Sequence, residues 1–122
     1  MNNLSILIVE DNFELGQIFV EILATDAAHV ELIRDGQKAL DYLSKNRPDI
    51  IVLDIQLPHV SGDLILKQIR DTAELKDTRV VMVTANAIMA TMVESQADVV
   101  LIKPVSHTQL SSLVHRLSTP HL

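Results

Sequence analysis

The sequence predicts an α/β fold in which helices cover both faces of a parallel five-stranded sheet, a doubly wound (βα)5 three-layer sandwich. Four short runs, residues 6–9, 50–53, 80–83 and 99–102, are almost purely aliphatic and rich in β-branched residues. Runs without polar alternation are typical of parallel strands buried on both faces. Segments with helical spacing separate these runs. Because parallel strands need crossover connections, and these are right-handed, the helices are expected on both faces.

Length and composition are consistent with one domain. The 122 residues are too few for two separate cores, so we interpret residues 1–122 as a single unit with a core at about 4–117 and a loose tail at 118–122. Hydrophobic residues make up 48% of the chain and aromatic residues only 2%, which predicts an aliphatic core.

Composition also excludes several classes of function. Sixteen acidic residues against ten basic ones give a net charge of -6, and no window gathers enough basic residues to follow a phosphate backbone. The absence of cysteine excludes a disulfide framework, a thiolate zinc site and a cysteine nucleophile. The longest stretch free of charge, residues 80–93, is too short and too polar to span a bilayer, and the start of the chain is not a signal peptide. We therefore expect a soluble, cytoplasmic domain that binds neither nucleic acid nor membranes.

The first elements have distinct signatures. Residues 29–33 form a weaker fifth strand candidate, in which Glu31 interrupts the run as expected for an edge strand with one face partly in water. Asp35 is the expected N-cap of the second helix, ahead of apolar Ala39, Leu40 and Leu43. The first helix is indicated by an apolar stripe with intervals of three and four, formed by Leu15, Ile18, Phe19, Ile22 and Leu23.

The remaining helices follow the same logic. Ser61 is the expected cap of the third helix, whose apolar residues are Leu64, Ile65, Leu66 and Ile69. A segment rich in alanine and methionine, running to about Ser95, predicts the fourth helix, and we interpret Met82, Met89 and Met92 as core residues. The last helix is expected from about Ser106 to Leu117, with one face formed by Leu110, Leu113, Val114 and Leu117.

Polar side chains follow four of the predicted strands. Glu10 and Asp11 follow the first run, Asp54 the second, Thr84 the third and Lys103 the fourth. The carboxyl ends of parallel strands meet at one edge of a sheet, where ligands bind. Any one of these residues could simply end a strand or cap a helix. Their coincidence at one edge indicates a chemical site.

This set of side chains suits phosphoryl transfer. Three carboxylates within a few ångströms cannot all ionise unless a cation joins them, and Mg²⁺ accepts carboxylates while keeping positions for water and phosphate oxygens. A lysine and a threonine hydroxyl would neutralise and bind the equatorial oxygens while a carboxylate attacks phosphorus. The product would be an aspartyl phosphate.

Ordered motifs then identify the family that the chain resembles. They are Glu10-Asp11, the hydrophobic run that ends in Asp54, the stretch from Asp54 through Pro58 to Gly62, Thr84-Ala85 and Lys103-Pro104. Together they resemble the receiver domains of two-component response regulators, over residues 4–117. The resemblance implies a flavodoxin-like fold with strand order 2-1-3-4-5.

The resemblance also implies a role for each site residue. Asp54 would be the phosphoacceptor. Mg²⁺, with Mn²⁺ as a possible substitute, would be bound by Asp11, by Glu10 largely through water, by Asp54 and by the backbone carbonyl of Gln56. Thr84, Lys103 and backbone N–H groups near Gln56 and Ala85 would bind phosphoryl oxygens. The family has a cis peptide after this lysine, here Lys103-Pro104, which would help to aim the ammonium. Pro58 and Gly62 would shape the loop after the third strand, and His59 is expected to be a loop histidine partly in solvent.

The implied function is signalling by a domain that is not an enzyme beyond Mg²⁺-dependent self-phosphorylation and slow autodephosphorylation. The phosphoryl group would come from a sensor histidine kinase or a histidine phosphotransfer protein, and the phosphorylated surface would act on a downstream protein, with a phosphorylation-dependent dimer as one possibility. Gln56 and Asn86 flank the position of an attacking water and would tune the lifetime of the phosphoryl group. The chain would be either a free-standing regulator or the receiver of a longer protein.

Two departures from the family concern the output of the signal. Receivers usually have Tyr or Phe three residues before the site lysine, where this sequence has Val100, so the usual aromatic switch is absent or replaced. The segment between Thr84 and Lys103 is also a few residues shorter than in the receivers that the chain resembles. This leaves roughly ten residues for the fourth helix and predicts that the helix is short or irregular.

Four alternatives compete with this interpretation. An aspartyl-phosphate hydrolase needs an acid where Gln56 stands. A flavodoxin-like nucleotide binder is disfavoured because Glu10 and Asp11 would repel phosphate. A cobalamin module would pair His59 with an acid at the position of Leu57. The fourth alternative is a pseudo-receiver that binds proteins without being phosphorylated, and the intact set of site residues ranks it low.

Overall fold

The computed structural model describes residues 4–24, 27 and 29–118. In chain order its elements are β1 (Ser5–Val9), α1 (Phe13–Ala24), β2 (His29–Ile33), α2 (Gly36–Leu43), β3 (Ile50–Asp54), α3 (Gly62–Asp71), the 3-10 turn η1 (Ala73–Leu75), β4 (Arg79–Thr84), α4 (Ala87–Val93), β5 (Val99–Ile102) and α5 (His107–Leu117). The predicted tail falls mostly on residues 119–122, which lie outside the described residues. Ser118 itself caps α5 through its N–H and the carbonyl of Val114, at 3.0 Å.

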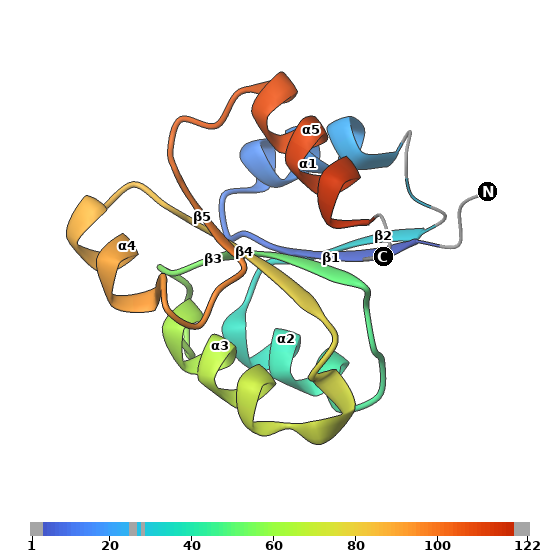
Figure 1. Ribbon diagram of the computed structural model, residues 1–122, viewed down its shortest axis with the longest axis vertical. Helices are drawn as coiled ribbons and strands as arrows, with labels where there is room; N and C mark the ends of the chain where they lie inside the picture. The colour runs from blue at the N-terminus through green and yellow to red at the C-terminus, as the bar shows by residue number, and fades with distance from the viewer. Residues whose placement is uncertain (1–3, 25–26, 28, 119–122) are drawn as a thin grey trace.

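The strands form one parallel sheet in the order β2-β1-β3-β4-β5, which confirms the expected doubly wound topology. Helices α1 and α5 cover one face, and α2 and α3 cover the other (Figure 1). Strand β2 lies at one edge and β5 at the opposite edge, so β1, β3 and β4 have a strand on each side, and the helices shield both faces of the sheet. Their side chains alternate between the two helical layers, as residues of buried strands do.

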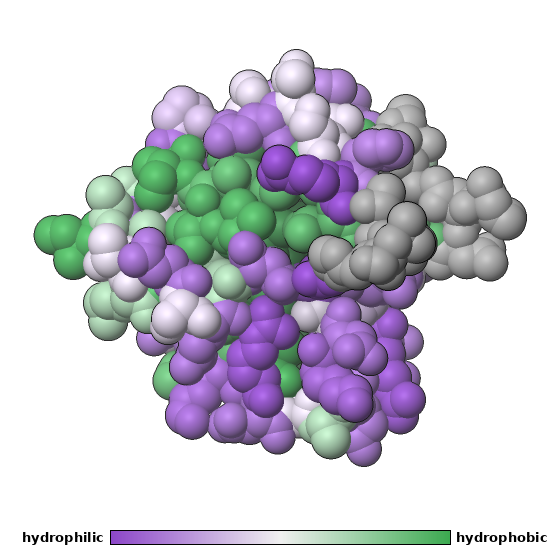
Figure 2. Space-filling view, in the orientation of Figure 1, coloured by the Kyte–Doolittle hydropathy of each residue, from purple (hydrophilic) through white to green (hydrophobic). Residues whose placement is uncertain are grey.

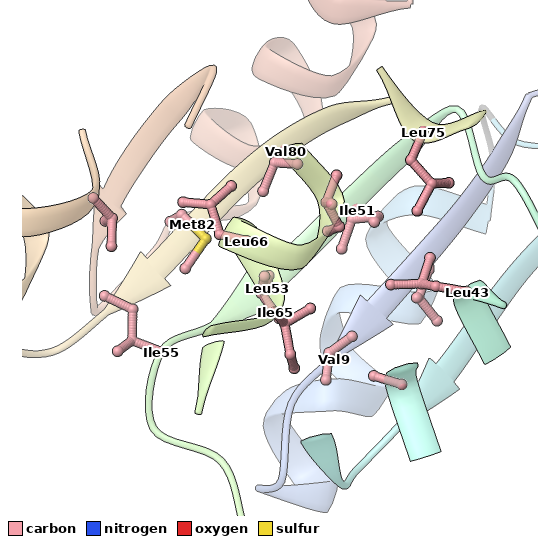
Figure 3. Packing of buried hydrophobic residues seen from close by; sticks show 14 residues of the cluster. Val9, Leu43, Ile51, Leu53, Ile55, Ile65, Leu66, Leu75, Val80 and Met82 are labelled. Carbon is pink, nitrogen blue, oxygen red and sulfur yellow. The ribbon is translucent and has the colours of Figure 1, made fainter. Parts of the chain in front are cut away.

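Two aliphatic clusters follow from this alternation. The cluster under α2, α3 and α4 is shown in Figure 3, and from the sheet it includes Leu7, Val9, Ile51, Leu53, Val80 and Met82. The opposite cluster, under α1 and α5, contains the neighbouring strand residues Ile6, Ile8, Ile50, Val52, Val81 and Val83. Phe19 is the one aromatic side chain in the fully buried part of either cluster among the described residues. Both clusters are therefore aliphatic, as the composition predicts.

Three predicted core residues are exposed. Ile18, Leu64 and Met92 expose 52%, 56% and 71% of their surface, so their assignment to the buried faces of three helices was wrong. Each helix touches the sheet along one stripe only, and these residues lie beside it. Met82 is buried and Met89 is half-buried against the same cluster, so only part of the methionine prediction is confirmed.

The predicted helix starts are largely confirmed. Asp35 accepts a hydrogen bond from the Lys38 N–H at 3.0 Å, and Ser106 forms a reciprocal capping box with Gln109. Ser61 occupies the N-cap position of α3, but its side chain makes no capping hydrogen bond. In the described part of the chain, no helix is long and apolar enough to cross a membrane.

Candidate functional site

The predicted side chains meet at the carboxyl edge of the sheet because the strand ladder carries each of them there. Asp54 is the last residue of β3, and Thr84 is the last residue of β4. Glu10 follows β1 and is held by a hydrogen bond from its N–H to the Ile33 carbonyl at 3.0 Å. Lys103 follows β5, and its N–H donates to the Thr84 carbonyl at 2.8 Å. Backbone pairing therefore extends to all four positions.

The core of the site is buried and its charges are paired. Glu10, Asp54 and Thr84 expose 1%, 5% and 0% of their surface. Lys103 Nζ lies 3.0 Å from Asp54 Oδ2 and 3.0 Å from Glu10 Oε1, so one ammonium group joins two carboxylates. The bond between Lys103 and Pro104 is cis, as the resemblance implies. Such buried acids are tolerated only when a cation accompanies them.

The electrostatics leave the site with excess negative charge. Burial raises the pKa of Glu10, repulsion from Asp54 raises it further, and the bond with Lys103 opposes both effects. Burial alone would lower the pKa of Lys103, but the adjacent Glu10 and Asp54 carboxylates raise it overall, so this group stays an ammonium. One ammonium cannot balance three carboxylates.

A hard divalent cation fits this donor set. Carboxylate oxygens of Glu10, Asp11 and Asp54 all lie within 4.8 Å of one another. Glu10 Oε1 is buried and accepts no hydrogen bond of good geometry, although the Lys103 ammonium is close. An oxygen in that condition is suited to a metal-bound water, and an all-oxygen set of this kind suits Mg²⁺. Asp11 is exposed and forms the open side of the site.

The loop after β3 is fixed closely over Asp54. The Gln56 N–H donates to Asp54 Oδ1 at 3.1 Å, and the Gly62 N–H donates to the Ile55 carbonyl at 2.6 Å. A Cβ atom on Gly62 would lie 2.1 Å from the Asp54 carbonyl oxygen, so this approach requires glycine. Gln56, whose backbone carbonyl the family resemblance implies as a ligand, is exposed beside the site.

His59 continues this loop in a left-handed backbone conformation, with φ of 70°. Its side chain is 72% exposed and pairs with Asp35 at the start of α2, while the Gly36 N–H donates to the Pro58 carbonyl at 3.1 Å. The loop histidine is therefore largely in solvent, as expected, and it connects the loop to α2.

Thr84 connects the site to α4. Its buried Oγ1 accepts a hydrogen bond from the Asn86 N–H at 3.1 Å, and Asn86 in turn caps α4 by accepting from the N–H groups of Ile88 and Met89 at 2.9 and 3.1 Å. Ala85 is exposed between them. A movement of the Thr84 hydroxyl would therefore change its hydrogen bond with Asn86 and, through this N-cap, the position of the first turn of α4.

The two predicted departures lie next to this connection. Helix α4 has seven residues, which confirms the expected short helix. Val100 is half-buried in β5 and packs against the cluster that also contains Met89 and Val93 of α4. Val100 thus fills space under α4 in this conformation.

One contact at the site had no signal in the sequence. Arg34, directly after β2, donates from Nε and Nη2 to the backbone carbonyl of Asp11 at 3.3 and 3.2 Å. An arginine after an edge strand carries no motif of its own, and only the three-dimensional arrangement shows this contact.

Comparisons with known proteins agree with this geometry. The family model described as "Response regulator receiver domain" matches residues 6–115. The polar-differentiation response regulator DivK of Brucella anthropi is 40% identical over 83 residues, which are 68% of each chain. Among solved structures, the chemotaxis response regulator CheY4 of Vibrio cholerae superposes with a TM-score of 0.85 at 26% identity, covering 93% of this chain and 98% of that one. The bacteriophytochrome response regulator RtBRR gives a TM-score of 0.82 at 30% identity, covering 98% and 81%.

Receiver domains take phosphoryl groups from kinases and act on downstream targets, and they are signal transducers rather than enzymes. The buried acids, the bridging lysine, the threonine at the end of β4 and the strand order are the features expected of that class. With the family model covering most of its length, the chain belongs to the response regulator receiver domain family.

Proposed function

We propose that Asp54 is the phosphoacceptor of this receiver and that Glu10, Asp11, Asp54 and the Gln56 carbonyl hold the Mg²⁺ ion the reaction needs, with Mn²⁺ as a substitute. The observation that carries the proposal is the Lys103 ammonium, 3.0 Å from both Asp54 and Glu10 inside a buried acidic cluster. Bound there, the ion would neutralise charge on the transferring phosphoryl group.

The chain's own residues would act as follows. An Asp54 carboxylate oxygen attacks the phosphorus of a phosphohistidine, the new O–P bond forms as the N–P bond breaks, and a proton from solvent goes to the departing imidazole. Lys103 exchanges its ion pair with Asp54 for one with a phosphoryl oxygen. The Thr84 hydroxyl donates a hydrogen bond to another phosphoryl oxygen, and the N–H groups of Gln56 and Ala85 donate to the phosphoryl oxygens as well.

The acyl phosphate then decays by attack of water on phosphorus, which regenerates the Asp54 carboxylate. Gln56 and Asn86 are both exposed. We expect their side chains to flank the attacking water and to set the rate of this step. Asn86 is also the N-cap of α4, so its substitution would change both the lifetime of the phosphoryl group and the stability of the helix.

The proposal also includes the partners of the chain. The phosphoryl group would come from a histidine kinase or phosphotransfer protein, and the phosphorylated domain would act on a protein target. Dimerisation on phosphorylation and a cytoplasmic location are part of the same proposal. We treat residues 1–122 as one receiver unit.

The test is intact-mass spectrometry after incubation with acetyl phosphate. Native chain with Mg²⁺ should gain one phosphoryl group, while Asp54→Asn, and native chain with EDTA, should gain none. Asp71→Asn is the matched control because it removes one exposed carboxylate at the end of α3 and should react like the native chain. A phosphoryl group on Asp54→Asn would overturn the assignment. No adduct in any sample, when another receiver reacts under the same conditions, would favour the pseudo-receiver alternative.

A further inference from the structure

We propose that Arg34 is a positioning residue that fixes the backbone of Asp11 and thereby holds the Asp11 carboxylate in place for the cation. The inference rests on the proposed function, because it takes Asp11 as a metal ligand. It adds a residue outside the acid, threonine and lysine set, directly after β2, a strand that supplies none of those side chains.

Arg34 makes two hydrogen bonds to the same backbone oxygen. Its Nε and Nη2 both donate to the Asp11 carbonyl oxygen, at 3.3 and 3.2 Å, so two arms of the guanidinium converge on one acceptor. The guanidinium carbon also lies 5.2 Å from the centre of the Phe13 ring, within the range of a cation–π contact. Phe13 begins α1, so Arg34 is held between the loop that it fixes and the helix that follows.

The end of β2 thus controls both acidic residues after β1. The Ile33 carbonyl accepts from the Glu10 N–H at 3.0 Å, and the next residue, Arg34, holds the Asp11 carbonyl. The two cases differ in what else supports the acid. Glu10 is 1% exposed and paired with Lys103, whereas Asp11 is exposed on the open side of the site. An exposed ligand depends more on its backbone being fixed.

The choice of acceptor favours positioning over charge pairing. Arg34 bonds to the carbonyl of Asp11, and among residues 4–24, 27 and 29–118 no ion pair within 4.0 Å joins it to a carboxylate. Both carboxylate oxygens of Asp11 therefore stay available to a cation. An arginine that served to neutralise the acidic cluster would instead compete with the metal for those oxygens.

Charge and positioning make opposite predictions for Mg²⁺ affinity. Arg34 is a fixed positive charge beside a site for a divalent cation, so by Coulomb repulsion alone its removal should tighten Mg²⁺ binding. If Arg34 positions Asp11, its removal should weaken binding, because the ligand must then be ordered at the moment of binding. The direction of the change therefore separates the two roles.

The experiment is a calorimetric Mg²⁺ titration of the native chain, Arg34→Gln, Arg34→Lys and the control Arg47→Gln. Arg47 is exposed and precedes β3, so it lies at the amino ends of the strands, away from the site at their carboxyl ends. Its substitution by glutamine makes the same change in net charge. We expect Mg²⁺ affinity to fall about 5- to 10-fold in Arg34→Gln, below the range seen for more buried supporting residues. Arg34→Lys should also bind several-fold more weakly, because an ammonium keeps the charge and loses the planar fork. Arg47→Gln should bind like the native chain.

Phosphorylation by acetyl phosphate gives the second readout. The Mg²⁺ concentration for half-maximal rate should rise by the same factor in Arg34→Gln, while the rate at saturating Mg²⁺ stays within about twofold of native. General destabilisation would not raise the half-maximal Mg²⁺ concentration while leaving the rate at saturating Mg²⁺ unchanged. The midpoint of thermal unfolding in EDTA checks that each variant is folded.

Native-like or tighter Mg²⁺ binding in Arg34→Gln or Arg34→Lys would overturn the positioning role while leaving the proposed function in place. If the native chain binds Mg²⁺ but takes up no phosphoryl group, the proposed function fails and the titration still decides the role of Arg34. If the native chain binds no Mg²⁺, both proposals fail.

Discussion

The phosphoryl site and the neighbouring surface of α4 both lie at the carboxyl ends of the strands, yet the fold specifies their positions to very different degrees. In the site, Glu10, Asp54 and Thr84 are almost completely buried. On α4, Ile88 and Met92 expose 76% and 71% of their surface, and Ile102 at the end of β5 exposes 43%. Figure 2 shows hydrophobic residues on the side of the molecule where α4 lies and in the region between α4 and α5.

The difference shows which parts of a receiver can change without loss of its chemistry. Site residues stand on strand ends whose backbone is hydrogen-bonded to its neighbours, so their positions follow from the sheet. Helix α4 has seven residues and contacts the sheet through one face, which includes Ala90 and Val93. The exposed face of α4 does not pack against the core, and the two departures from the family pattern, Val100 and the short segment that contains α4, lie beside or within this helix.

The largest expected effect comes from removing the charge at the centre of the site. Lys103→Met should lower the rate of phosphoryl uptake about 100-fold, as loss of one transition-state donor does. It should also lower the free energy of unfolding in EDTA by about 1–3 kcal/mol, less than for a fully buried pair because the Lys103 side chain is 22% exposed. Mass spectrometry and urea unfolding measure the two effects.

Lys67→Met is the matched control for that variant. Lys67 pairs with Asp71 on the surface of α3 at 3.1 Å, with both side chains more than half exposed, so its loss should change the free energy of unfolding by less than about 0.5 kcal/mol. Equal effects at Lys103 and Lys67 would mean that burial does not distinguish the two ion pairs.

The second effect concerns the close packing of the loop over the acceptor. Gly62→Ala should lower the free energy of unfolding by about 1–3 kcal/mol and slow phosphoryl uptake, because the new methyl group would meet the backbone of Asp54 at 2.1 Å. Gly16→Ala should be nearly neutral. There the methyl group meets only the flexible end of Leu32 at 2.9 Å, and alanine favours the helix. Urea unfolding of both variants makes the comparison, and a neutral Gly62→Ala would show that the loop can move away from Asp54.

These contrasts also explain what the sequence could predict. Aliphatic runs identify the strands, and the parallel sheet brings the residues after them to one edge, so the positions of Asp54, Thr84 and Lys103 followed from the pattern alone. The strand order and the cis bond at Pro104 came from the family resemblance. Ordered motifs carry this information because each lies at a strand end.

The errors have physical causes as well. Ile18, Leu64 and Met92 fit a helical stripe in sequence, but periodicity does not show how wide a stripe the sheet covers. The hydrogen bonds from Arg34 to Asp11 form where two loops meet beside β1 and β2, and no local pattern in either loop predicts them. Contacts between loops are decided by the tertiary fold, whereas strand ends are decided by hydrophobicity.

A smaller effect is expected on the exposed face of α4. The double variant Ile88→Ser, Met92→Ser should change the free energy of unfolding by less than about 0.5 kcal/mol and the rate of phosphoryl uptake by less than twofold, because neither side chain contributes to the core. Urea unfolding and intact-mass kinetics measure these quantities. A large loss of either would mean that this face supports the fold or the site, and the contrast between the two regions would fail.

The smallest effect concerns the exposed pair that connects the loop after β3 to α2. The hydrogen bond from the Lys38 N–H lowers the pKa of Asp35, and His59 lowers it further. A carboxyl group whose pKa is lower in the folded state stabilises the fold at pH values above its unfolded pKa, about 3.9, and this contribution is lost as the pH falls through the folded value.

Asparagine caps helices as well as aspartate does, so Asp35→Asn removes the charge and keeps the cap. The stability difference between the native chain and Asp35→Asn should therefore be present at pH 6 and should be lost as the pH falls through the folded pKa of Asp35, because the carboxyl group is then protonated in both states. His59→Gln should remove only part of this pH dependence, because the bond with the Lys38 N–H is the larger cause and stays in place. Thermal unfolding midpoints between pH 3 and pH 6 test both variants. Equal losses in the two variants would make the ion pair, rather than the helix cap, the dominant contact of Asp35, and would tie the loop over the acceptor to α2 more strongly than its exposure suggests.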